Sequence, residues 1–147
     1  MTRGVTIVAC LLGALGGLVP PALAECARSD FESVVDAAAG SLRDMNAANK
    51  PKFQEKLRQL KEKRGWSQDQ FLREGAPLVA DDKIATFDQQ SSALLEKIAT
   101  GGEAGAAAAK PDCSVLESLR ASMKTLVETQ AAKWIYMTTR IDAELAK

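Results

Sequence analysis

The chain has 147 residues, of which 46% are hydrophobic and 26% charged, and its 19 basic and 19 acidic residues give a net charge of zero. A neutral chain lacks the electrostatic footprint of a nucleic-acid-binding protein, so no nucleic-acid partner is expected. The sequence contains no histidine, which excludes Ser-His-Asp and Cys-His catalysis and removes the commonest metal ligand.

The first 24 residues have the three parts of a secretory signal peptide. Arg3 is basic, an apolar run extends from Val5 to Val19, and Ala22-Leu23-Ala24 provides a small-x-small cleavage site. The run is too short for a membrane anchor, which needs roughly 20 apolar residues. We therefore expect cleavage after Ala24, a periplasmic or secreted location, and a single helical domain over 25–147.

A lipoprotein signal is the alternative for this leader. Ile7-Val8-Ala9-Cys10 looks like a lipoprotein cleavage box. It would leave an apolar region of only Val5 to Ala9, which is too short to engage the export machinery. The cleavable signal peptide is the favoured interpretation.

Cys26 and Cys113 are the two cysteines that remain after the leader is removed. An even number of cysteines in an oxidising compartment indicates a disulfide, and two free buried thiols are the alternative. The two positions are 87 residues apart, so the bond would close most of the domain into one loop.

The segment 29–64 is predicted to form one long helix. Ser29 and Glu32 form a possible capping box at its start, Pro51 predicts a kink, and Gly65 predicts its end. Apolar residues recur every three or four positions along it. They are Phe31, Val34, Val35, Ala38, Leu42, Met45, Phe53, Leu57 and Leu60.

A second helical arm is predicted over 67–99. Ser67 and Gln70 form a capping box at its start, and Gly75-Ala76-Pro77 is expected to interrupt it. Asp81-Asp82 is expected to cap the helix that continues the arm, and Gly101-Gly102 to end it. Residues 100–112 then resemble a linker.

The last arm, 113–146, carries the clearest apolar stripe. Its spacing is typical of helical bundles. The stripe consists of Leu116, Leu119, Met123, Leu126, Gln130, Trp134, Met137, Ile141 and Leu145. A Cys26–Cys113 bond requires the starts of the first and last arms to meet at one end. The sequence therefore predicts an all-α fold: an elongated, three-arm antiparallel bundle of three to four helices with one disulfide.

Three groups of residues are candidates for function or for packing. Gln130 is expected to set register in the core, with a polar contact inside a ligand pocket as the alternative. Ile135 and Tyr136 lie off the apolar stripe, which indicates a second contact surface for another arm or for a partner. Lys52, Lys56 and Lys63 share one flank of helix 51–64 and are candidates for binding an anionic surface, the alternative being a solvated face.

No motif for a cofactor, a metal or a nucleotide is present in the sequence. The expected function is therefore non-enzymatic: a binding, interaction or chaperone-like role in the cell envelope, with another envelope protein as partner. Peripheral docking on an anionic membrane through helix 51–64 is the alternative. A small enzyme that acts through Arg, Lys and Glu without histidine is the third hypothesis.

Overall fold

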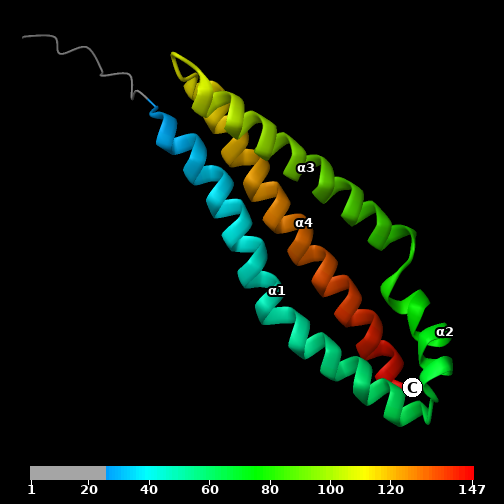
Figure 1. The fold of residues 1–147 in the computed structure, drawn as a ribbon. Helices are drawn as coiled ribbons and strands as arrows, with labels where there is room; N and C mark the ends of the chain where they lie inside the picture. The colour runs from blue at the N-terminus through cyan, green and yellow to red at the C-terminus, as the bar shows by residue number, and fades with distance from the viewer. Residues whose placement is uncertain (1–25) are drawn as a thin grey trace, which may run out of the picture.

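The computed structural model describes residues 26–147, and the predicted signal peptide lies outside them. The order of elements is α1 (Arg28–Arg64), α2 (Gln68–Val79), α3 (Asp82–Ala107) and α4 (Cys113–Ala146). Figure 1 shows three long arms side by side, with the short α2 joining α1 to α3 at the end opposite the α3–α4 turn. The predicted all-α, elongated three-arm bundle is confirmed.

The disulfide joins the starts of the first and last arms. Cys26 and Cys113 are bonded, with their Cα atoms 5.5 Å apart. The backbone N–H of Cys26 also lies 3.1 Å from the Cys113 sulfur. The bond places the start of α1 next to the start of α4, so these two arms run parallel. The arm α3 returns from the α2 end to the disulfide end and is antiparallel to both.

Most of the predicted helix boundaries follow from local chemistry. Gly65 adopts φ of 63° and ends α1 in the left-handed conformation that favours glycine. Ser67 and Gln70 make the reciprocal capping bonds at the start of α2. Asp112 accepts a hydrogen bond from the Ser114 N–H, 2.9 Å away, and caps α4.

The start of α1 differs from the prediction. The helix begins at Arg28, one residue before the expected cap at Ser29, and the Asp30 carboxylate accepts a hydrogen bond of 2.7 Å from the Ala27 N–H. The disulfide at Cys26 fixes the chain immediately before the helix. Ser29 therefore lies in the first turn, where its carbonyl accepts a hydrogen bond from Ser33.

Two predicted helix breaks are absent from the described residues. Pro77 lies inside α2, near its end, and the carbonyl that loses a partner belongs to Arg73, an exposed residue. The break comes instead at Ala80, and Asp81 caps α3 by accepting a hydrogen bond of 2.8 Å from the Ile84 N–H.

Gly101-Gly102 does not end α3, which continues to Ala107 and takes in part of the expected linker. A Cβ at Gly102 would lie 2.4 Å from Cγ2 of Val35, and one at Gly105 would lie 2.1 Å from Cδ1 of Phe31. These glycines let α3 approach α1 closely. The packing offsets the helix-propensity cost of about 1 kcal/mol per glycine.

The apolar core is divided into two clusters along the bundle. The first, at the disulfide end, has as its buried members Phe31, Val34, Ala38, Ile98, Leu116, Leu119 and Leu126. The second, at the α2 end, has Phe53, Leu60, Ile84, Met137 and Ile141. The stretch of α4 between Leu126 and Met137 contains Gln130, whose side-chain amide donates to the hydroxyl of Ser91, 2.7 Å away on α3.

Ser91 is only 3% exposed, so its bond to Gln130 lies in a largely dry part of the bundle. A buried hydrogen-bonded pair favours one alignment of two helices, because any shift leaves polar groups without partners. This geometry supports the expected role of Gln130, which is to set the register of α4 against α3.

Candidate functional site

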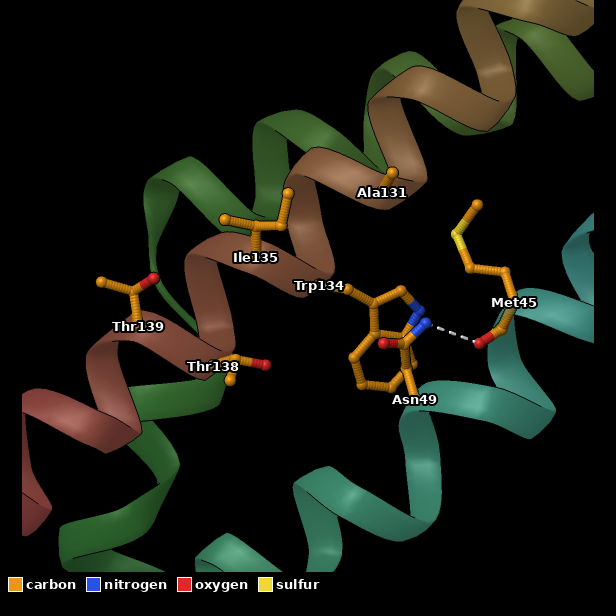
Figure 2. Close-up of a pocket in the computed structure, with 7 residues that line it drawn as sticks. All are labelled: Met45, Asn49, Ala131, Trp134, Ile135, Thr138 and Thr139. Atoms are coloured by element: carbon orange, nitrogen blue, oxygen red, sulfur yellow. Dashed lines mark hydrogen bonds between the residues drawn. The ribbon is translucent and has the colours of Figure 1, made fainter.

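A hollow opens between α1 and α4 at the junction of the two core clusters. Its volume is about 340 Å³, and its lining comes from Met45 and Asn49 on α1 and from Ala131, Trp134, Ile135, Thr138 and Thr139 on α4. Figure 2 shows the Trp134 ring reaching from α4 toward α1 and facing Asn49. We refer to this feature as the Trp134 hollow.

The hollow lies next to the bend in α1. Pro51 is inside that helix and has no N–H to donate to the carbonyl one turn earlier, so the helix bends there. The bend is visible in Figure 1 about halfway along α1. Asn49, two residues before the proline, donates its side-chain amide to the Met45 carbonyl at 2.8 Å (Figure 2).

The Trp134 side chain is held in place by two contacts with α1. Its indole N–H donates to the Asn46 side-chain oxygen at 3.3 Å. Its ring meets Phe53 edge-on, with the centroids 5.7 Å apart. Ile135 has no such cover and is 68% exposed. None of the seven lining residues is charged, so the hollow is suited to an uncharged, largely apolar group.

The structure separates Ile135 from Tyr136, which were predicted to share a contact surface. Ile135 lines the Trp134 hollow. The Tyr136 hydroxyl instead donates to Asp81 at 2.8 Å, and its ring lies 6.3 Å from that of Phe87 on α3. Tyr136 thus contacts another arm, whereas Ile135 stays largely exposed.

Asp81, at the α2–α3 break, is bonded to both α3 and α4. Its Oδ1 atom caps α3, while its Oδ2 atom accepts hydrogen bonds from Tyr136 and Arg140 on α4. The hydrogen bond from the Ile84 N–H, then that from Tyr136, lowers the pKa of the Asp81 carboxyl. These bonds tie the α2–α3 break to α3 and α4, which is a structural role.

A carboxylate with a lowered pKa stabilises the folded state above its unfolded pKa of about 3.9, and this stabilisation is lost as the pH falls through the folded pKa. Because the Asp81 pKa is lowered, the melting temperature should fall in acid below about pH 4. In Asp81→Asn the fall should be shallower. Circular dichroism melts between about pH 2 and pH 7 measure both slopes.

Asp82→Asn serves as the matched control, because Asp82 is the adjacent carboxylate and is exposed. Its acid slope should stay close to that of the wild type. Equal slopes for wild type and Asp81→Asn would contradict the role given to Asp81.

Two of the three lysines predicted to bind an anionic surface have partners in the bundle. Lys56 forms an ion pair with Asp142 of α4. Lys63 donates to the Leu145 carbonyl in the last turn of α4. Both residues thus tie α1 to α4, and within residues 26–147 Lys52 is the one member of the trio with neither an ion pair nor a side-chain hydrogen bond.

Sequence reasoning assigned Trp134 and Met45 to the apolar stripes of their helices and gave no role to Asn49. The hollow depends on how a bend in α1 meets a face of α4, and the only local signal for it is Pro51. The contacts of Asp81 with Tyr136 and Arg140 join residues more than 50 positions apart, so no sequence spacing indicates them.

Within residues 26–147, no group of three or more acidic residues or cysteines is placed to hold a metal ion. In the same part of the chain, no helix has the length and apolar character needed to cross a membrane. Comparisons with protein families, with curated proteins and with solved structures find no match for the chain.

Proposed function

We propose that this protein is a non-enzymatic binding protein of the cell envelope, and that the Trp134 hollow is its interaction surface. The observation that carries the proposal is the exposure of Ile135, at 68%, on the rim of a hollow without charged residues. A large apolar side chain beside a partly covered tryptophan is typical of the centre of a protein–protein contact.

The partner that fits this surface is another envelope protein with an exposed, uncharged apolar segment. Such a segment could fill the hollow beside Trp134 and cover Ile135, while Thr138 and Thr139 supply hydroxyl groups for its polar backbone. The export of the chain rests on the signal-like leader, and the Cys26–Cys113 disulfide is compatible with an oxidising compartment.

The test compares capture of partners from an envelope extract by three immobilised forms of the protein. Ile135→Asp places a charge on the rim and should reduce capture of the specific partner by tenfold or more, on the order of a hot-spot residue. Leu72→Asp is the matched control, because Leu72 is 60% exposed but lies on α2, outside the hollow. It should capture the partner as the wild type does.

Both substitutions lie at exposed positions, so their melting temperatures should match that of the wild type. Loss of capture by Leu72→Asp to the same extent as by Ile135→Asp would contradict the proposal. Equal capture by all three forms would contradict it as well.

A further inference from the structure

A second hollow lies between α1 and α3 near the disulfide, and it differs in character from the Trp134 hollow. Its volume is about 430 Å³. Its floor is made of small or aliphatic residues, Val35, Ala99, Gly102 and Ala106, and its rim carries three carboxylates, Glu32, Asp36 and Glu103. No basic residue lines it.

The rim carboxylates continue into a stripe of alternating sign along α1. Asp36, Arg43 and Lys50 recur every seven residues, and Glu32 lies one turn before Asp36, so the four side chains share one flank of the helix. All four are exposed, and within residues 26–147 none of them takes part in an ion pair or a side-chain hydrogen bond. We call these four residues the α1 stripe.

The two ends of the α1 stripe are too far apart to pair with each other inside one molecule. Glu32 and Lys50 are 18 residues apart on a helix, which places them about 27 Å from each other. That separation is far greater than the 4 Å reach of an ion pair and exceeds the Debye length at physiological salt. The acidic end and the basic end of the α1 stripe are therefore both open to a second molecule.

The acidic residues lie at one end of the α1 stripe and the basic residues at the other. The stripe is therefore complementary in charge to a second copy of itself that runs in the opposite direction. We propose that two copies of this chain associate through their α1 stripes, with the helices antiparallel and related by a two-fold axis beside Ser41. This pairing sets Glu32 opposite Lys50 of the second copy. Asp36 then lies about one helical turn, roughly 5 Å, from the position opposite Arg43 of the second copy, within reach of that long side chain.

The same axis leaves small side chains at the centre of the contact. Ala39 and Gly40, close to the axis, are small enough for two helices to approach each other closely. Every contact occurs twice, so the association stops at a dimer.

Charge reversal tests this pairing, with sedimentation velocity as the measurement. The wild type should form dimers at low salt and dissociate at about 0.5 M salt. E32K/D36K makes the whole stripe basic, and R43E/K50E makes it acidic. Each variant alone should associate at least about tenfold more weakly than the wild type, because like charges then face each other.

Two rescues distinguish a specific pairing from a general effect of charge. An equimolar mixture of E32K/D36K and R43E/K50E should dimerise again, because a basic stripe then meets an acidic one. The chain that combines all four substitutions should also dimerise by itself, since the order of signs is reversed but remains self-complementary. The control E74K/E128K has the same change in net charge as E32K/D36K but lies on α2 and α4, and it should dimerise as the wild type does.

The proposal is overturned if the wild type is monomeric at low salt, if the two reversed variants dimerise as well as the wild type, or if neither rescue restores the dimer. The pairing is independent of the proposed function, because it uses the flank of α1 that borders α3 and not the hollow between α1 and α4. Ile135→Asp should therefore lose its partner and keep the dimer, so the two proposals can fail separately.

Discussion

Replacing Cys26 and Cys113 together by serine is expected to lower the free energy of unfolding by about 4–5 kcal/mol. The bond closes a loop of 87 residues, and loop-closure entropy in the unfolded chain grows with loop length. The melting temperature should fall by on the order of 15 °C. Urea denaturation of the oxidised protein and of the double variant measures the difference in stability.

Two further measurements support or contradict this assignment. Reduction of the wild type with dithiothreitol should produce the same loss as the double substitution, whereas the double variant should not respond to the reductant. Thiol titration of the denatured, unreduced protein should find neither Cys26 nor Cys113 free. Equal stability with and without reductant would show that the bond does not constrain the unfolded chain as proposed.

Replacing Gly105 by alanine is expected to destabilise the bundle by about 2–3 kcal/mol, even though alanine is the better helix former. The added Cβ would lie 2.1 Å from Cδ1 and 2.2 Å from Cε1 of Phe31. The Phe31 ring is 0% exposed and packed in the disulfide-end core, so it cannot swing aside without disturbing its neighbours. Either α1 or α3 must then move.

Gly40→Ala is the matched control for Gly105→Ala, because Gly40 is also inside a helix but has room for a side chain. The nearest neighbour of an added methyl group there would be the Arg43 guanidinium, at 3.8 Å. This change should stabilise the protein by about 0.5–1 kcal/mol. Urea denaturation at high salt, where association through the α1 stripe is suppressed, gives both values. A Gly105→Ala protein as stable as the wild type would contradict the close approach of α3 to α1.

Local chemistry explains the features of the fold that the sequence predicted correctly. The stop at Gly65 needs only a residue that adopts a positive φ after the last turn of a helix. The box formed by Ser67 and Gln70 needs only two side chains three positions apart. The three-arm topology followed from one long-range constraint, the Cys26–Cys113 bond, combined with the lengths of the arms.

The incorrect predictions concern residues whose conformation depends on distant neighbours. Gly101 and Gly102 have the composition of a helix end, yet α3 continues through them because their missing side chains make room for Val35 and Leu119. The gain from close packing between helices exceeds the local cost of glycine, and a local pattern contains no information about that gain.

The candidate site shows the same division between sequence and tertiary structure. The sequence by itself placed Ile135 and Tyr136 off the apolar stripe of the last arm, which the helical period determines. Only the tertiary structure decided that Tyr136 bonds to Asp81 while Ile135 stays exposed beside Trp134. The direction of a side chain follows from the helical period, but its partner follows from the packing of whole helices against one another.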